Sequence, residues 1–183
     1  MRAFIALELP DEFVGQTAQL ARALQAHVQG RFMKHDTYHL TLAFLGDVDE
    51  RQVKAAMEAM DAISHHRAVP LRPEGLGSFK ARKERTLYLA LERMPQGQLR
   101  AKALRWELES RNIPFDSKKF IPHVTRARRA KIAGADLSVL PFPHEAIASD
   151  VTLFKSILSH EGATYKPLYT VELQRTDSET RTS

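Results

Sequence analysis

Two histidine-threonine pairs are the residues of this 183-residue chain whose types and spacing best suit catalysis. His39 and Thr41 form the first pair, and His123 and Thr125 form the second. Residues two apart in a β-strand point to the same face, so each pair would present an imidazole and a hydroxyl together. A single histidine on a strand is more often structural than catalytic. Two such pairs in one chain favour a shared catalytic cleft.

Acid-base cleavage at phosphorus is the chemistry that two such pairs would serve. In-line displacement at a phosphoryl group needs a base on one side and an acid on the other. Imidazole has a reference pKa of about 6.5, so one ring can be neutral while the other is protonated, and each can contribute roughly 10²–10⁴-fold. Threonine hydroxyls can donate hydrogen bonds to the non-bridging oxygens, where negative charge gathers.

Positive charge near the second pair predicts an anionic substrate. The chain has a formal net charge of +5, and residues 117–135 contain six basic residues and no acidic one. We single out Arg128, three residues after Thr125, because a guanidinium there could clamp a phosphate with two hydrogen bonds. A solvated basic surface is the alternative for Lys118 and Lys131, and for most of a second basic stretch that contains Lys80, Arg82, Lys83 and Arg85.

The chain repeats itself at an offset of 84 residues. We interpret the repeat as an internal duplication that gives two similar lobes about an approximate twofold axis and brings both pairs to one cleft. The alternative is a chance alignment of common residues. The matching segments are Ala6-Leu7-Glu8 with Ala90-Leu91-Glu92, Leu20 and Leu24 with Leu104 and Leu108, and His39-Leu40-Thr41 with His123-Val124-Thr125.

Each repeat has the pattern of a strand, a helix and a second strand. Short apolar runs predict the strands, and apolar residues at helical spacing predict the helices. A further helix follows Asp49, which can cap it together with Gln52. The expected fold class is α+β, with one bilobal domain over residues 1–174 and a flexible polar tail over residues 175–183. The expected ranges are 4–9, 11–29 and 38–45, then 86–91, 96–112 and 120–125, and finally strands at 151–158 and 165–173.

The residue types also exclude several classes of protein. The chain has no cysteine, which rules out disulfides, a thiol nucleophile and thiolate zinc sites, and fits the reducing cytoplasm. No stretch approaches the ~18 apolar residues that a membrane span needs. Eight histidines are present, including His65 and His66, but no His-x₃-His pair occurs on a predicted helix, and no glycine-rich phosphate loop occurs. The acidic residues nearest the two motifs, Asp36, Asp47 and Asp116, have no ligand-like spacing. We therefore expect a cytoplasmic monomer with no metal, cofactor, membrane association or protein partner.

The two pairs lie in segments that resemble a known family. The first lies in the run His-Leu-Thr-Leu-Ala-Phe-Leu-Gly, the second lies in Pro-His-Val-Thr, and Arg-Ala-Phe-Ile-Ala-Leu-Glu-Leu-Pro follows Met1. From Met1 to about Leu173 the sequence resembles the 2H phosphoesterases, specifically the bacterial and archaeal RNA 2′,3′-cyclic phosphodiesterases, also called 2′-5′ RNA ligases. The segments that look like that family's closing strands are Leu153-Phe154-Lys155-Ser156 and Tyr165-Lys166-Pro167-Leu168.

The resemblance implies a fold, a reaction and residue roles. It implies antiparallel sheets around a central cleft, and metal-independent hydrolysis of RNA 2′,3′-cyclic phosphate ends that leaves a 2′-phosphate. His39 would be the proton donor and His123 the proton acceptor. The implied phosphate-binding residues are Thr41, Thr125 and Arg128. One departure is Arg126, which stands where the family has an apolar residue, and strand alternation turns it away from Thr125 without defining its role.

Aromatic residues near the two motifs could stack on a nucleobase. Tyr38, Phe79 and Phe120 are the candidates, with core packing as the alternative for each. Phe44 lies on the opposite strand parity from His39, which argues against it. Reversible joining of RNA ends through a 2′-5′ bond stays open, because it would use the same site in reverse. A non-catalytic RNA-binding module is the third interpretation.

Overall fold

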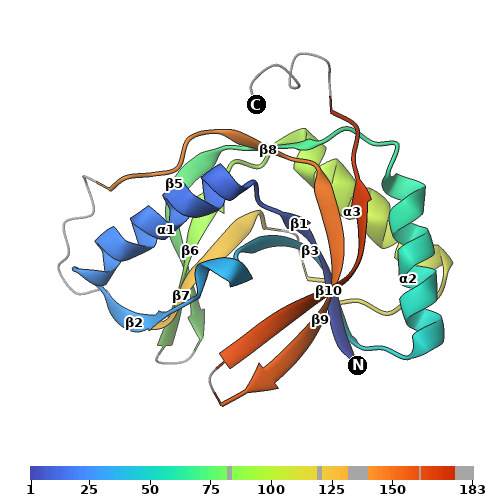
Figure 1. The fold of residues 1–183 in the computed structure, drawn as a ribbon, viewed down its shortest axis with the longest axis horizontal. Coiled ribbons are helices and arrows are strands. Elements are labelled where there is room, and N and C mark those ends of the chain that lie inside the picture. The colour runs from blue at the N-terminus through green and yellow to red at the C-terminus, as the bar shows by residue number, and fades with distance from the viewer. Residues whose placement is uncertain (82–83, 119–120, 132–139, 161, 176–183) are drawn as a thin grey trace.

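The computed structural model describes residues 1–81, 84–118, 121–131, 140–160 and 162–175, which form a mixed α+β fold with antiparallel sheets. One four-stranded sheet has the order β10-β9-β1-β3, and a second has the order β2-β7-β6-β5 (Figure 1). The strands of the first sheet are β1 (Arg2–Glu8), β3 (His39–Asp47), β9 (Asp150–Ser159) and β10 (Gly162–Glu172). Those of the second are β2 (Gln29–Phe32), β5 (Pro73–Ala81), β6 (Glu84–Leu91) and β7 (His123–Lys131).

Helices and short elements connect these strands. The α-helices of the described residues are α1 (Asp11–Gln25), α2 (Glu50–Ile63) and α3 (Pro95–Ser110). A 3₁₀ turn, η1 (His35–Thr37), precedes β3, and β4 (Val69–Leu71) pairs with β8 (Ala146–Ala148). No helix in this part of the chain is both long and apolar enough to span a bilayer.

The helices follow the predicted signals with small changes at their ends. Asp49 and Gln52 form the expected capping box at the start of α2. Helix α1 ends at Gln25 instead of residue 29, because the chain turns there and enters β2, which pairs with β7. Helix α3 begins one residue before the predicted position, at Pro95, a residue favoured in the first helical turn.

Two strands that the sequence did not predict, β2 and β5, form the edges of the second sheet. Strand β5 lacks a regular apolar alternation and contains Gly75 and Gly77. Gly77 is required because the ring of Tyr88 on β6 occupies the space that a Cβ would need. Strand β7 starts at His123, later than predicted, and continues through the basic run to Lys131. The predicted tail, apart from Arg175, lies outside the described residues.

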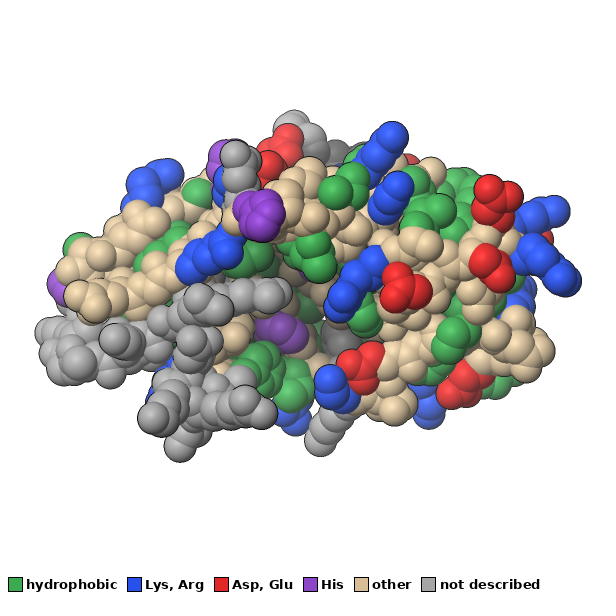
Figure 2. Space-filling model, turned by 90° about the horizontal axis from the view of Figure 1, so that it is seen from below, with side chains coloured by type: hydrophobic (Ala, Val, Ile, Leu, Met, Phe, Trp, Pro, Cys, Tyr) green, Lys and Arg blue, Asp and Glu red, His purple; other side chains and the backbone are tan. Residues whose placement is uncertain are grey.

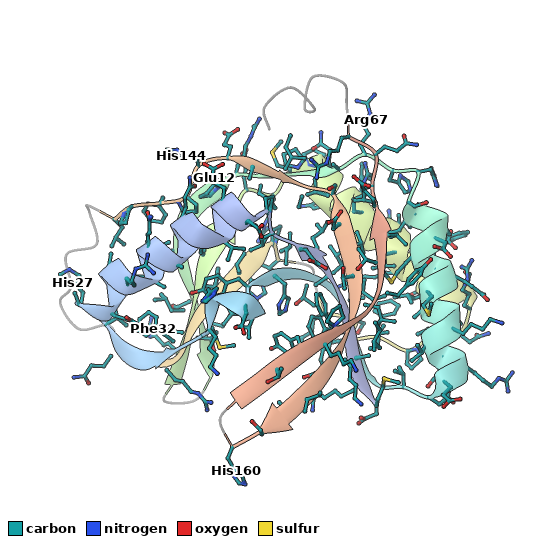
Figure 3. The ribbon with its side chains drawn as sticks, in the orientation of Figure 1. Glu12, His27, Phe32, Arg67, His144 and His160 are labelled. Atoms are coloured by element: carbon teal, nitrogen blue, oxygen red, sulfur yellow. The ribbon has the colours of Figure 1, made fainter. Side chains whose placement is uncertain are left out.

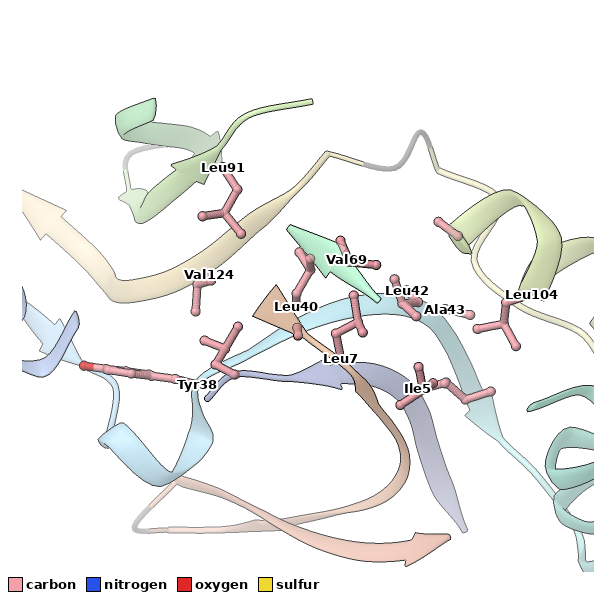
Figure 4. Close-up of a cluster of buried hydrophobic side chains, with 14 of the residues drawn as sticks. Ile5, Leu7, Tyr38, Leu40, Leu42, Ala43, Val69, Leu91, Leu104 and Val124 are labelled. Carbon is pink, nitrogen blue, oxygen red and sulfur yellow. The ribbon is translucent and has the colours of Figure 1, made fainter. Parts of the chain in front are cut away.

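The hydrophobic core lies on the faces of β3 and β7 opposite to the two histidine-threonine pairs (Figure 4). Leu40 and Leu42 of β3 and Val124 of β7 are almost completely buried there. Burial of such side chains contributes roughly 1.5–3 kcal/mol each. The alternation of strand side chains thus fixes each histidine on the face away from the core.

Candidate active site

One cavity contains both histidine-threonine pairs. His39 and His123 are the first residues of β3 and β7, which belong to different sheets. Together with Thr41 and Thr125 they line a cavity of about 380 Å³. Figure 2, seen from the side of the β9-β10 hairpin, shows a histidine recessed below the surrounding surface. The structure therefore brings together the four residues that the motif spacing selected.

Both imidazoles are oriented by the same kind of hydrogen bond. Nδ1 of His39 lies 2.7 Å from the carbonyl oxygen of Thr37, and Nδ1 of His123 lies 2.6 Å from that of Ile121. A carbonyl oxygen only accepts, so Nδ1 donates in each ring and Nε2 is the basic nitrogen of the neutral form. Each partner stands two residues before its histidine. This arrangement defines which nitrogen of each ring can exchange a proton with a substrate.

Aromatic side chains pack against both imidazoles. The ring of Phe4 lies 4.7 Å from that of His39, and Tyr165 meets the same imidazole edge-on at 5.2 Å. Phe79 and Tyr88 contact His123 at centroid distances of 5.1 and 5.2 Å. These contacts limit rotation of the two imidazoles and exclude water from one side of each. Phe79, which the sequence suggested as an aromatic residue near the two motifs, therefore lies beside His123.

A β-bulge brings Phe44 to the cavity and overturns the prediction from strand parity. In the pairing of β1 with β3, Ala6 is opposite Thr41 and Ile5 is opposite Ala43, so Leu42 is an extra residue. The bulge reverses the alternation beyond it, and Phe44 therefore shares the face of Thr41. The guanidinium of Arg2 lies 5.0 Å from the centre of the Phe44 ring, where a cation and an aromatic face attract each other.

The other residues selected from the sequence have different positions. Tyr38 is only 7% exposed and belongs to the hydrophobic core, outside the described lining of the cavity. Arg126 and Arg128 lie on β7, where Arg128 pairs with Arg31 of β2, and their side chains are outside the description. Phe120 is likewise outside the described residues.

Sequence reasoning missed several lining residues, which come from β1, from η1 and the segment before it, and from the β9-β10 hairpin. Phe4 had a signal in the sequence, because it is the repeat counterpart of Tyr88. Ser156 and Tyr165 pair with each other and lie in the segments that resemble closing strands. The labelled histidines of Figure 3 lie at the periphery, away from the cavity. The lining residues that were missed are Arg2, Phe4, Met33, Thr37, Ser156, Leu158, Ala163 and Tyr165.

The two imidazoles differ in their neighbours on the adjacent strand. Glu8 of β1 pairs with His39, whereas Ala90 of β6 pairs with His123. The Glu8 carboxylate accepts a hydrogen bond from Thr152, whose hydroxyl also contacts that of Thr170 at 2.7 Å. Glu8 is thereby held in place beside one histidine, and the other histidine has no charged counterpart at the equivalent position.

An apolar cavity adjoins the cavity that contains the histidines. The two cavities share the lining residues Thr41, Phe44 and His123. Arg105 of α3 borders the apolar cavity and donates hydrogen bonds to the carbonyl oxygens of Leu42 at 3.2 Å and Lys118 at 2.9 Å. Burial lowers the pKa of Arg105 from its ordinary value. The Asp116 carboxylate accepts a hydrogen bond from the Lys118 backbone and pairs with the Lys118 ammonium at 3.0 Å, which lowers the pKa of Asp116.

Comparisons with known proteins point to one family. Residues 7–88 match the family model described as LigT like Phosphoesterase. The chain is 27% identical over 181 residues to the RNA 2′,3′-cyclic phosphodiesterase of Thermotoga maritima, covering 95% of this chain and 96% of that one. It is 26% identical over 170 residues to the Escherichia coli protein of the same name, covering 91% and 93%.

Solved structures give the same result for the fold. The crystal structure of Escherichia coli LigT in its apo form superposes with a TM-score of 0.78 at 27% identity, covering 94% of this chain and 96% of that one. The complex of Escherichia coli LigT with 3′-AMP has the same TM-score at 25% identity, covering 94% and 97%. The fold and the sequence therefore agree over almost the whole length of both chains.

Proposed function

Since the chain belongs to the LigT-like phosphoesterases of the 2H superfamily and is a hydrolase of phosphodiester bonds, we propose that it opens RNA 2′,3′-cyclic phosphate ends to 2′-phosphomonoesters by acid-base catalysis with His39 and His123. One observation carries the proposal. The two imidazoles come from different sheets, line one cavity, and are oriented by equivalent hydrogen bonds from Nδ1. A base and an acid on opposite sides of a phosphoryl group need this arrangement.

In the proposed reaction Nε2 of neutral His123 accepts a proton from water while the water oxygen attacks phosphorus. The bond from phosphorus to the 3′ oxygen breaks, and protonated His39 donates its proton to that oxygen. Thr41 and Thr125 donate hydrogen bonds to the non-bridging oxygens, which carry the growing negative charge. We include Arg128 as a phosphate ligand. The product keeps its phosphate on the 2′ oxygen.

The neighbours of the two imidazoles support the assignment of acid and base. Paired residues of antiparallel strands have Cβ atoms about 4.5–5.5 Å apart and share a face. Glu8 therefore brings a negative charge to His39, which favours a protonated imidazole and thus the proton donor. Ala90 brings no charge to His123, which suits the proton acceptor.

The deciding experiment incubates the protein with a nucleoside 2′,3′-cyclic phosphate in the presence of EDTA and identifies the product isomer by phosphorus NMR. We expect the 2′-phosphate. A 3′-phosphate would contradict the proposed leaving oxygen, and hydrolysis that EDTA abolishes would contradict a metal-independent reaction. Intact substrate together with salt-sensitive RNA binding would indicate a binding module.

The proposal also includes the state of the protein in the cell. We propose a monomer that acts in the cytoplasm on RNA or nucleotides with cyclic phosphate ends. The names of the relatives in Thermotoga maritima and Escherichia coli are those of hydrolases, so hydrolysis is preferred to joining of RNA ends. An assay that offers the protein the cyclic substrate together with an oligonucleotide that carries a free 5′-hydroxyl measures both reactions at once, as a 2′-phosphate and as a 2′-5′ linked product.

A further inference from the structure

A second groove continues from the cavity that contains the histidines. It has a volume of about 390 Å³ and lies between β2 with the segment before η1 on one side and the β9-β10 hairpin on the other (Figure 1). The two cavities share Met33, Thr37, Leu158 and Ala163. Thr37 is also the residue whose carbonyl oxygen orients His39. The groove therefore adjoins the cavity that contains His39.

The volumes of the two cavities correspond to successive parts of one ligand. Sites for small organic ligands measure about 300–1,000 Å³, and each of the two cavities alone reaches the lower part of this range. A cyclic phosphate with its ribose needs the first cavity, where the histidines and threonines lie. A chain that continues beyond this ribose needs a further groove of similar size, and the second cavity supplies one.

The chemistry of the second groove suits a nucleotide linked through a phosphate. Arg31 and Lys34 line it, and an exposed cation beside a groove is the usual partner of a phosphodiester backbone. Phe32 and Met33 supply an aromatic and an apolar surface on the same wall, and Phe32 is labelled in Figure 3 beside β2. Leu158 on the opposite wall is 66% exposed and offers the groove an apolar surface.

Arg31 reaches across the groove to the hairpin. An added Cβ at Gly162 would lie 2.8 Å from a terminal nitrogen of the Arg31 guanidinium, so this nitrogen already lies close to the Gly162 backbone. Gly162 also has a φ of +130°, which L-residues rarely adopt. Glycine at the start of β10 thus allows a cation from β2 to close the outer end of the groove.

The apolar cavity on the other side of the site is less suited to a phosphate. Its exposed cation, Lys118, already pairs with Asp116 at 3.0 Å. The Arg105 guanidinium there donates to two backbone carbonyl oxygens. A phosphodiester placed in this cavity would approach the Asp116 carboxylate, whose negative charge would repel it.

We propose that the groove of Arg31, Lys34 and the β9-β10 hairpin binds the phosphodiester and the nucleotide that precede the cyclic end, and that the enzyme therefore prefers oligonucleotides to mononucleotides. The inference rests on the proposed function and adds a substrate class to it. The strand leaves the imidazoles past Thr37 and Met33, and its first bridging phosphate lies between Arg31 and Lys34.

The test compares three substrates that differ by one part at a time: adenosine 2′,3′-cyclic phosphate, the same nucleotide with a 5′-phosphate, and the dinucleotide ApA with a cyclic end. We expect kcat/KM to rise when the 5′-phosphate is added and again when the second nucleotide is added. In Lys34→Ala and in Arg31→Ala the ratio of the dinucleotide value to the mononucleotide value should fall by about threefold to tenfold. The matched control is Lys54→Ala on the exposed side of α2, which should keep the ratio.

A binding measurement separates this inference from the proposed reaction. The affinities of adenosine 2′-phosphate and of the dinucleotide ending in a 2′-phosphate, measured by calorimetry, require no turnover. Tighter binding of the dinucleotide that weakens in Lys34→Ala and with rising salt supports the groove. Equal affinities for the two ligands, or a preference that is lost in Lys118→Ala and kept in Lys34→Ala and Arg31→Ala, would overturn it. Absence of hydrolysis would contradict only the proposed reaction.

Discussion

Phe4 and Tyr88 are separated by 84 residues, as His39 and His123 are, and each aromatic ring packs against the histidine of its own sheet. Phe4 lies on β1 next to β3, and Tyr88 lies on β6 next to β7. The 84-residue repeat therefore includes the aromatic residue that packs against each imidazole as well as the histidine itself. Orientation of a catalytic group depends on such support, since a displacement of about 1 Å can reduce the rate roughly 10²-fold.

Gly77→Ala tests the support of His123 without changing a residue that lines the first cavity. The new methyl group would overlap the Tyr88 ring, which stacks on Phe79 at 4.4 Å, and both rings contact His123. We expect kcat to fall roughly 10–100-fold and stability to fall by about 1–3 kcal/mol. Steady-state kinetics and urea denaturation measure the two effects.

Gly15→Ala is the matched control for this substitution. Gly15 lies in α1, and an added Cβ there meets no atom within 4 Å. Alanine in a helix should raise the stability by about 0.4–1 kcal/mol and leave kcat unchanged. Normal kcat in Gly77→Ala would show that Tyr88 does not hold His123 in its active orientation.

Substitution of either histidine of the proposed acid-base pair should abolish most of the activity. His39→Ala and His123→Ala each remove one partner of proton transfer, so each should lower kcat at least ~10²-fold. Because the two groups act in one step, the double variant should be little slower than the worse of the two single variants. The control is His144→Ala, a histidine that lies outside the cavity in Figure 3. Near-normal turnover of either single variant would refute the role assigned to that residue.

The sequence was sufficient to predict that each histidine shares a strand face with its threonine, and the reason is local. His39 with Thr41 and His123 with Thr125 share a face through the two-residue period of a strand, which needs no knowledge of the partner strands. The same rule failed for Phe44 because the bulge at Leu42 depends on pairing with β1. The two-residue period of a strand cannot reveal a bulge, because the extra residue is defined only by pairing with the neighbouring strand.

Strands β2 and β5 lack an apolar pattern, and the sequence could not reveal them. Strand β2 is four residues long, and three of them are exposed. Glycine, serine and lysine interrupt the apolar residues of β5. Gly77 is needed there because the Tyr88 ring covers it, so the fit of β5 depends on a side chain from another strand. An apolar residue in a predicted helix is also not always buried. Leu99 and Trp106 lie in the predicted helix and are exposed. These features follow from tertiary packing.

His66 should make the native state sensitive to acid. Burial lowers the pKa of His66 from its ordinary value of 6.5, and the charge of Arg100 lowers it further. The Arg100 guanidinium lies 3.3 Å from Nδ1 of His66, which links the end of α2 to α3. The unfolded chain then binds more protons than the native state, so stability should be lost as the pH falls below about 6.5. In His66→Gln the free energy of unfolding should vary less between pH 7.5 and 5.5.

The control for this measurement is His160→Gln, because His160 lies at the tip of the β9-β10 hairpin in Figure 3, whereas Arg100 belongs to α3. This variant should retain the pH dependence of the parent protein. A pH dependence in His66→Gln as steep as that of the parent would contradict the role of His66 and direct attention to other titrating groups.

Glu8→Gln should move one limb of the pH profile and leave the other in place. The proposed mechanism needs protonated His39 and neutral His123, so the rate should follow a bell whose alkaline limb reports His39. Removal of the Glu8 charge makes protonated His39 less favourable, and the alkaline limb should therefore shift to lower pH. The amide of the substituted side chain retains an oxygen that can accept the hydrogen bond of Thr152.

The other groups that face His39 do not change in this variant. Arg2, Tyr165 and His123 line the same cavity, and Phe4 and Phe154 contribute no charge. Glu12→Gln on the exposed start of α1 is the control of equal charge, and its profile should match that of the parent. Movement of the acid limb in Glu8→Gln with a fixed alkaline limb would reverse the assignment, because His39 would then be the base and His123 the acid.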